Sequence, residues 1–166
     1  MQIVIYDNKS GDPRTLEISE ALVTAIFEAS DGLYLPSAVI SRIHRNRVDL
    51  NRPYKPLDQR AIEIYNTFHT KILNTIEALK KKHDKVLILD IHGMKDNEEE
   101  IILGTNYGSS IADIKDWFYE LASELERHFN VSIDVPGYSG YHITQTYGSI
   151  KNVGVVQIEI ARRIRI

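Results

Sequence analysis

Short apolar segments rich in β-branched residues alternate along this chain with longer segments of helical periodicity. The clearest pair is a helical pattern over residues 57–82, followed by the continuous apolar run VLILDI at 86–91. This alternation is typical of α/β folds, because each helix packs against the sheet that the strands build together. We therefore expect a three-layer α/β sandwich with a mixed, largely parallel sheet flanked by helices. The predicted strands cover residues 2–6, 37–43, 85–91, 101–105, 131–136 and 153–166, and the predicted helices cover 15–30, 57–82 and 111–129.

The composition is that of one globular domain over residues 1–166, with 43% hydrophobic and 26% charged residues. A net charge of −3 gives no positive surface for nucleic acid or an anionic membrane, so neither is expected as a partner. The absence of cysteine excludes disulfides and thiolate chemistry and fits a reducing compartment. No signal-peptide pattern and no apolar stretch near the roughly 20 residues of a membrane span are present, so a cytoplasmic location is expected.

The apolar run at 86–91 contains Asp90 and is followed directly by His92 and Gly93. Carboxylates and imidazoles are costly to bury without partners, and ligands of open α/β sheets collect outside the carboxyl ends of the strands. His92 is therefore either an ordinary hydrogen-bonded surface group or a ligand, since neutral imidazole is a common metal ligand. Asp90 shares its face of the strand and could support the imidazole.

A second isolated acid, Glu159, lies in the closing segment VVQIEIA, where Gln157 shares its face. Three interpretations are open for Glu159. It lies on an edge strand with its polar face in water, it pairs with Arg162 or Arg163, or it is buried and acts as a general base.

The segment RNRVDLNRP combines arginines with acid and amide side chains. Arginine binds carboxylates in bidentate fashion, and asparagine adds a further donor. A basic loop is usually solvated, but the combination of arginines with Asp, Asn and Pro indicates a fixed geometry, in which Asp49 could hold one of the arginines in place. The Gly/Tyr/Ser segment 137–149 is predicted to be a loop, in which Tyr141 and His142 either cover the pocket or form an ordinary turn.

Five motifs occur in an order that resembles the N-formylglutamate amidohydrolase family. They are VDLNRP (48–53), LDIHG (89–93), LGTNYG (103–108), GYSGYHITQTYG (137–148) and VQIEIARRIR (156–165). The resemblance implies a zinc-carboxypeptidase-like fold and metal-dependent hydrolysis of an amide bond in an N-acyl amino acid, with a small substrate that carries a carboxylate.

The resemblance also implies roles for individual residues. His92 and Asp12 correspond to metal ligands, with zinc as the expected ion and other divalent transition metals as alternatives. Glu159 corresponds to the general base and acid. Asn51 and Arg52 correspond to the pair that recognises the substrate carboxylate, with Arg52 also aiding the polarised carbonyl.

Arg45 corresponds to an arginine that faces the substrate. One departure concerns the first strand, after which the family places a histidine ligand, whereas this chain has YDNKSG. Asp7 could replace that histidine, His142 could complete the site, or the site could be impaired. The rival functions are accordingly a carboxypeptidase-like peptidase and a non-catalytic relative that binds a small acidic ligand, and the oligomeric state is left open.

Overall fold

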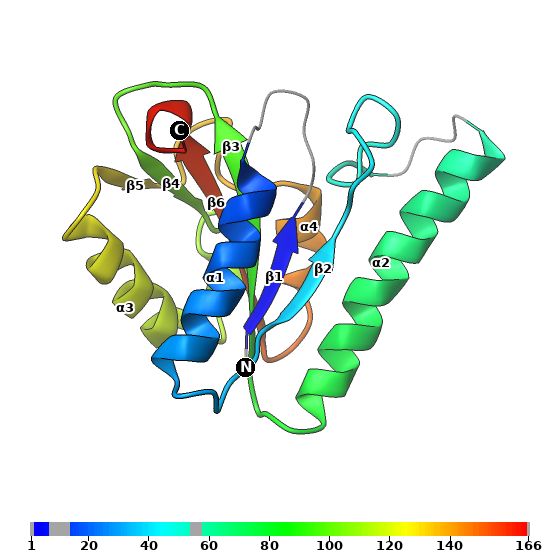
Figure 1. Ribbon diagram of the computed structural model, residues 1–166, viewed down its shortest axis with the longest axis horizontal. Coiled ribbons are helices and arrows are strands. Elements are labelled where there is room, and N and C mark those ends of the chain that lie inside the picture. Colours follow the sequence, from blue (N-terminus) through cyan, green and yellow to red (C-terminus); the bar gives the residue numbers. More distant parts are fainter. Residues whose placement is uncertain (1, 7–13, 54–57, 166) are drawn as a thin grey trace.

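The computed structural model describes residues 14–53 and 58–165, together with the backbone of residues 2–6, and has a six-stranded sheet as its centre. The strand order is β2-β1-β3-β6-β4-β5. Strands β1, β2, β3 and β6 are parallel, whereas β4 pairs with β6 in antiparallel orientation (Figure 1). The prediction of a mixed, largely parallel sheet is confirmed.

The elements follow one another in the predicted alternation of strands and helices. Strands are β1 (Gln2–Tyr6), β2 (Ser37–Ile40), β3 (Val86–Met94), β4 (Ile101–Gly104), β5 (Val131–Ile133) and β6 (Val153–Ala161). Helices are α1 (Thr15–Ala29), α2 (Gln59–Lys80), α3 (Lys115–Glu126) and α4 (His142–Tyr147), with short 3₁₀ turns at Ser109–Ile111 and Arg162–Ile164.

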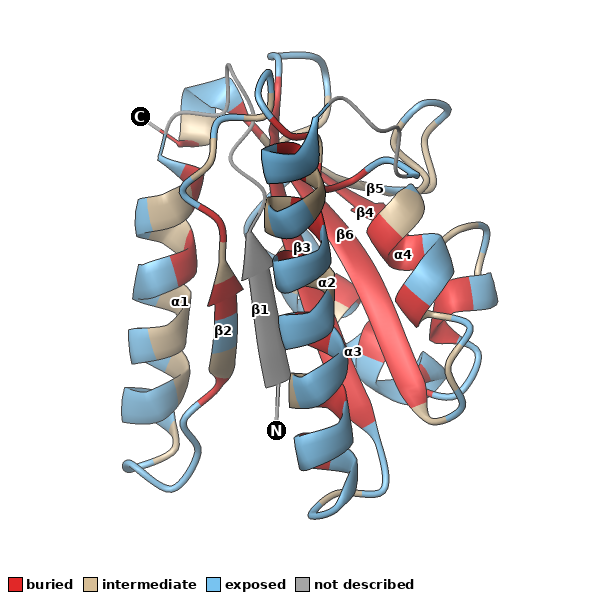
Figure 2. Cartoon of the chain, turned by 90° about the vertical axis from the view of Figure 1, so that its right-hand side faces the viewer, coloured by how far each residue is buried: buried red, intermediate tan, exposed pale blue. Residues whose placement is uncertain are grey.

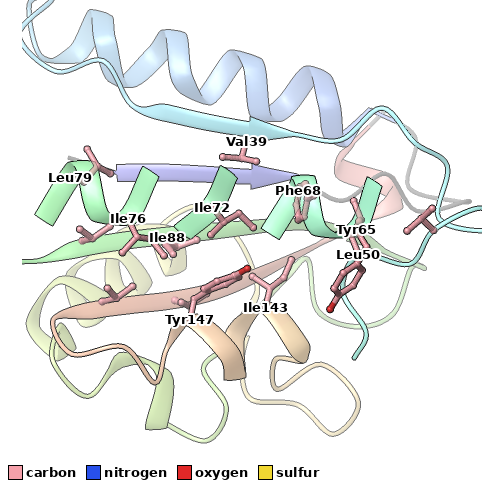
Figure 3. Packing of buried hydrophobic residues seen from close by; sticks show 14 of the residues in the cluster. Val39, Leu50, Tyr65, Phe68, Ile72, Ile76, Leu79, Ile88, Ile143 and Tyr147 are labelled. Atoms are coloured by element: carbon pink, nitrogen blue, oxygen red, sulfur yellow. The ribbon is translucent and has the colours of Figure 1, made fainter. Parts of the chain in front are cut away.

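Helices cover both faces of the sheet, because the side chains of the central strands alternate between two apolar clusters. Val86 and Ile88 of β3 belong to a cluster with α2 and α4 (Figure 3). Leu87 and Leu89 belong to the opposite cluster, to which α1 and α3 contribute. Strands β3 and β6 are buried along almost their whole length (Figure 2), which accounts for their nearly continuous apolar sequences.

This alternation decides where the polar residues of the two central strands point. Since successive side chains alternate, Asp90 and His92 continue the row of Val86 and Ile88 toward the α2/α4 face. By the same rule Gln157 and Glu159 continue the row of Val153 and Val155 on β6, and all four polar side chains are on one face.

The strands predicted over 37–43, 131–136 and 153–166 are shorter than predicted, because β2, β5 and β6 end at Ile40, Ile133 and Ala161. Two further elements also differ from their predicted form. β3 extends to Met94, so His92 lies within the strand and not beyond its end. The predicted helix over 111–129 is divided, because a 3₁₀ turn ends at Ile111 and α3 begins only at Lys115.

The segment predicted to be a loop at 137–149 contains α4, which has six residues. A helix this short has no readable periodicity and depends on tertiary contacts. One such contact requires Gly104, since a Cβ there would lie 2.5 Å from the backbone oxygen of Tyr138 and 2.6 Å from the nitrogen of Gly140. The missing side chain lets the segment before α4 pack directly on β4.

No helix in the described part of the chain is both long and apolar enough to span a bilayer.

Candidate active site

Two pairs of buried polar residues lie side by side on the central strands. In the parallel register of β3 and β6, Asp90 is opposite Gln157, and His92 is opposite Glu159. The relative exposure is 0% for Asp90 and His92, 4% for Gln157 and 3% for Glu159. The interpretation of Glu159 as an edge-strand residue in water is wrong, because β6 lies between β3 and β4.

Gln157 orients the carboxylate of Glu159. Its Nε2 donates a hydrogen bond of 3.1 Å to Glu159 Oε1 from two residues along the same strand. Because an amide keeps its donor at every ordinary pH, this contact fixes one carboxylate oxygen without supplying a charge. Glu159 is thus held at the carboxyl end of β6, where parallel sheets place their ligands.

The imidazole of His92 contacts two polar side chains through one nitrogen. His92 Nε2 lies 2.8 Å from Asp90 Oδ1 and 3.3 Å from Asn51 Nδ2. Asn51 Oδ1 accepts the backbone N–H of Ile143 at 2.9 Å, so the Asn51 NH₂ group is the one that faces the imidazole. An unprotonated Nε2 can accept a hydrogen bond from the Asn51 NH₂ group. Its close contact with Asp90 Oδ1 instead requires a proton or a cation between Nε2 and Oδ1.

The contact between Asp90 and His92 is close but lacks the alignment of a hydrogen bond. Neither carboxylate oxygen of Asp90 accepts a hydrogen bond within the described ranges, although both are buried. A buried carboxylate beside an imidazole nitrogen, with no donor satisfying it, is the arrangement expected of two residues that share a cation. These two side chains therefore fit part of a metal site.

The described residues contain no group of three His, Cys, Asp or Glu side chains suited to a metal ion, so they supply at most part of such a site. The predicted ligand Asp12 and the substitute Asp7 both lie outside the described residues. Both ring nitrogens of His142 have protein partners, since Nε2 lies 2.7 Å from the hydroxyl of Tyr65 and Nδ1 lies 3.3 Å from the hydroxyl of Thr146.

The loop between β2 and α2 carries the predicted carboxylate-binding residues. Arg45 is held by Asp49 through contacts of 2.8 Å from Nε and 2.7 Å from a terminal nitrogen. The backbone N–H of Asn51 donates to the other oxygen of Asp49 at 3.1 Å. Asp49 therefore neutralises Arg45 and shapes the turn that presents Asn51.

Arg52 is the more accessible of the two arginines, with 44% side-chain exposure against 21% for Arg45. Its guanidinium carbon lies 3.8 Å from the ring centroid of Tyr141, and one terminal nitrogen donates to the backbone oxygen of Asn51 at 3.0 Å. The aromatic face and the carbonyl hold the guanidinium in one orientation, while part of its donor fork remains exposed to solvent.

Two histidine–tyrosine pairs join α2 to α4 beside this loop. His69 Nδ1 contacts the hydroxyl of Tyr147 at 2.5 Å, and His142 contacts Tyr65. Burial, and secondarily a positive charge on His142, lowers the pKa of His69 to about 4, although a hydrogen bond to the backbone of Leu50 opposes the shift. Burial also lowers the pKa of His142, and burial raises the pKa of Tyr147.

Tyr65, His69 and Tyr147 were not among the predicted site residues. The available signal was the spacing of Tyr65 and His69, four residues apart near the first turns of α2 and therefore on one side of the helix. Nothing in the sequence pairs either residue with α4, since that contact spans more than 70 positions.

The pKa of His69 predicts that stability falls in mild acid. An unfolded histidine has a pKa near 6.5, so below that pH the unfolded chain binds more protons than the folded chain does. The contribution of neutral His69 is complete above about pH 6.5 and is lost as the pH falls toward 4. Discounted for the partial exposure of the ring, we expect about 1–2 kcal/mol. Urea unfolding of wild type and His69→Gln between pH 4.5 and 7.5 would measure it, and parallel curves would contradict it.

Comparisons with known proteins concern the family and the fold. The family model for N-formylglutamate amidohydrolase matches residues 55–165. The fold is similar to that of an N-formylglutamate amidohydrolase from Ralstonia eutropha, with a TM-score of 0.69 and 17% identity over 97% of this chain and 81% of that chain. A gene product of Agrobacterium tumefaciens is similar at a TM-score of 0.63 and 17% identity, over 98% and 81% of the two chains. No curated protein matches the sequence.

Proposed function

The chain belongs to the N-formylglutamate amidohydrolase family, and we propose on that premise that it hydrolyses the amide bond of an N-acyl amino acid. N-formyl-L-glutamate is the first candidate substrate. The observation that carries the proposal is the pairing of buried Glu159 with buried His92 across β3 and β6, on the sheet face that also receives Asn51. The matched range begins after Arg52, so the roles of Arg45, Asn51 and Arg52 depend on geometry and on the resemblance of the VDLNRP motif.

Glu159 is assigned the proton transfers. As general base its carboxylate accepts a proton from the attacking water, and as general acid it returns that proton to the leaving amine nitrogen. Gln157 keeps the carboxylate in place during both steps through its bond to Oε1. The water adds its oxygen to the acyl carbon, the C–N bond breaks, and the products are an acid and a free amino acid.

Arg52 is assigned the substrate carboxylate. Its exposed guanidinium can form a bidentate contact, and its stacking on Tyr141 limits the orientations it adopts. Arg45 also belongs to the proposed substrate-binding set, although its ion pair with Asp49 occupies much of its charge. The expected effect of this binding is orientation of the amide toward Glu159 and His92.

We further propose that the site binds a divalent metal, with zinc as the first candidate. The buried Asp90 carboxylate and the imidazole nitrogen of His92 fit two of the required ligands, and Asp12 or Asp7 would supply another. Bound there, such an ion would lower the pKa of water and polarise the substrate carbonyl. The alternative is a non-catalytic relative, which the missing histidine after the first strand favours.

The test is elemental analysis of the purified protein, followed by assays with N-formyl-L-glutamate, N-acetyl-L-glutamate, N-formyl-L-glutamine and a peptide with C-terminal glutamate. We expect one tightly held divalent metal per chain, hydrolysis of the acidic N-acyl amino acids, and loss of activity on chelation. Turnover of the peptide alone would favour the peptidase. Calorimetric binding of L-glutamate without any turnover and without metal would refute the hydrolase and support a binding protein.

A further inference from the structure

Three consecutive residues of the β2–α2 loop are each held by a hydrogen bond from a helix. His69 Nε2 lies 3.1 Å from the backbone oxygen of Leu50, and the hydroxyl of Tyr65 donates to the backbone oxygen of Arg52 at 3.0 Å. Between them, Asn51 Oδ1 accepts the N–H of Ile143. Figure 3 draws Tyr65 and Leu50 at one end of the buried cluster. Residues 50–52 are thus held by two hydrogen bonds from α2 to the backbone carbonyls of Leu50 and Arg52, and by one from α4 to the side chain of Asn51.

A single assignment of protons satisfies the four helix-borne contacts around the two carbonyls. The Tyr147 hydroxyl donates to His69 Nδ1, and His69 Nε2–H then donates to Leu50. In the same sense His142 Nε2–H donates to the Tyr65 oxygen, and the Tyr65 hydroxyl donates to Arg52. Each chain runs from α4 through α2 to the loop.

Neutral His69 is essential to this arrangement, because only the Nε2–H tautomer both donates to Leu50 and accepts from Tyr147. The pKa of His69 near 4 keeps the ring neutral at physiological pH. The raised pKa of Tyr147 likewise keeps its hydroxyl a donor. The two chains of hydrogen bonds are therefore complete across the neutral range.

The polar groups at positions 65 and 69 are not needed to dock α2 on the sheet. That helix already buries an apolar face formed by Ala61, Phe68, Ile72, Ile76 and Leu79. The hydroxyl of Tyr65 and the ring nitrogens of His69 occur only where α2 passes the loop that carries Asn51 and Arg52. Their directed contacts end on the carbonyls that flank Asn51.

We propose that Tyr65 and His69 are positioning residues for substrate binding, which act by fixing the backbone of residues 50–52. With the backbone fixed, Asn51 remains against His92, and Arg52 remains in place to receive the substrate carboxylate. The effect on substrate binding rests on the proposed hydrolase function. The hydrogen bonds that fix the backbone of residues 50–52 are a property of the fold and do not depend on that function.

Four single variants test the proposal. Tyr65→Phe removes only a hydroxyl, and His69→Leu removes both ring nitrogens. His69→Gln is the conservative variant, since its amide places a donor near the position of Nε2. Tyr119→Phe, on α3 across the sheet and 60% exposed, is the matched tyrosine control. Circular dichroism melts would establish that each variant folds.

The first measurement is hydrogen–deuterium exchange of the peptide covering residues 49–52, and the second is steady-state kinetics with N-formyl-L-glutamate. Tyr65→Phe and His69→Leu should each exchange faster in this peptide and raise KM about threefold to tenfold, the effect of one net hydrogen bond, with a smaller change in kcat. His69→Gln should stay closer to wild type in both measurements than His69→Leu, and Tyr119→Phe should match wild type.

The two measurements separate the inference from the proposed function. A wild type inactive on every N-acyl substrate would refute the hydrolase, while exchange at residues 49–52 would still decide whether Tyr65 and His69 fix the loop. Unchanged exchange in both Tyr65→Phe and His69→Leu would overturn the inference. The inference would also be overturned if Tyr65→Phe and His69→Leu exchanged faster but remained active with an unchanged KM. An equal fall of kcat in His69→Leu and His69→Gln, with KM unaltered, would overturn it as well.

Discussion

Glu159→Gln is expected to lower kcat/KM for N-formyl-L-glutamate by about 10²- to 10⁴-fold, with the fold and any bound metal retained. The substitution keeps the size of the side chain but removes its ability to accept and return a proton. The other carboxylates described at the site, Asp49 and Asp90, lie beside Arg45 and His92, so neither is assigned the proton transfers. Kinetics, elemental analysis and thermal melts on the same preparation would measure the three quantities.

A matched control for this variant is Glu120→Gln on the exposed side of α3, which removes the same charge away from the site. It should leave kcat/KM unchanged. Retention of more than a tenth of wild-type activity by Glu159→Gln would remove this residue from the proton transfers and would direct attention to the acids outside the described residues. Loss of metal in Glu159→Gln would instead make Glu159 a ligand.

The fold class followed from the sequence because its signal is local. The continuous apolar run at 86–91 predicts a strand, and the helical spacing over 57–82 predicts a helix, without reference to the rest of the chain. The length of β3 was underestimated because Asp90 and His92 resemble the end of a strand when their neighbours are unknown. Buried in a parallel pair with β6, the same residues continue the strand to Met94.

The pairing of residues within the site could not be obtained in the same way. The sequence indicates that Asp90 and His92 share a face, as do Gln157 and Glu159, but the register that places His92 opposite Glu159 depends on which strands are neighbours. The motif resemblance brought these residues together, as expected of a site built from segments far apart in the chain.

Neither the hydrophobic periodicity nor the motif resemblance predicted the contacts of α2 with α4. α4 is too short to be recognised from six residues, and the hydrogen bonds of Tyr65 and His69 become meaningful only once that helix lies across from them. The role of Asn51 illustrates the same limit. Its contact with substrate stays a prediction, and the structure adds contacts that the sequence did not indicate, because its oxygen accepts from Ile143 and its NH₂ group faces His92.

His92→Ala is expected to abolish measurable hydrolysis, to remove any tightly bound metal and to lower the free energy of unfolding by about 3 kcal/mol. The stability loss follows because Asp90, fully buried and 2.8 Å from the imidazole, keeps its carboxylate but loses its nearest polar neighbour. Removing one member of a buried polar pair leaves the other uncompensated and typically costs more than the pair itself contributes. Urea unfolding, elemental analysis and kinetics would measure these effects.

The double variant Asp90→Asn, His92→Ala separates the two causes. If the uncompensated carboxylate is responsible for the instability, the neutral amide should restore part of the lost free energy of unfolding, while hydrolysis and metal binding remain absent. Stability that is no higher in the double variant than in His92→Ala would assign the loss to the cavity left by the imidazole, and Asp90 would then not depend on His92. Activity that survives in either variant would exclude His92 from the reaction and, with it, the pairing of His92 with Glu159 as the basis of the proposed function.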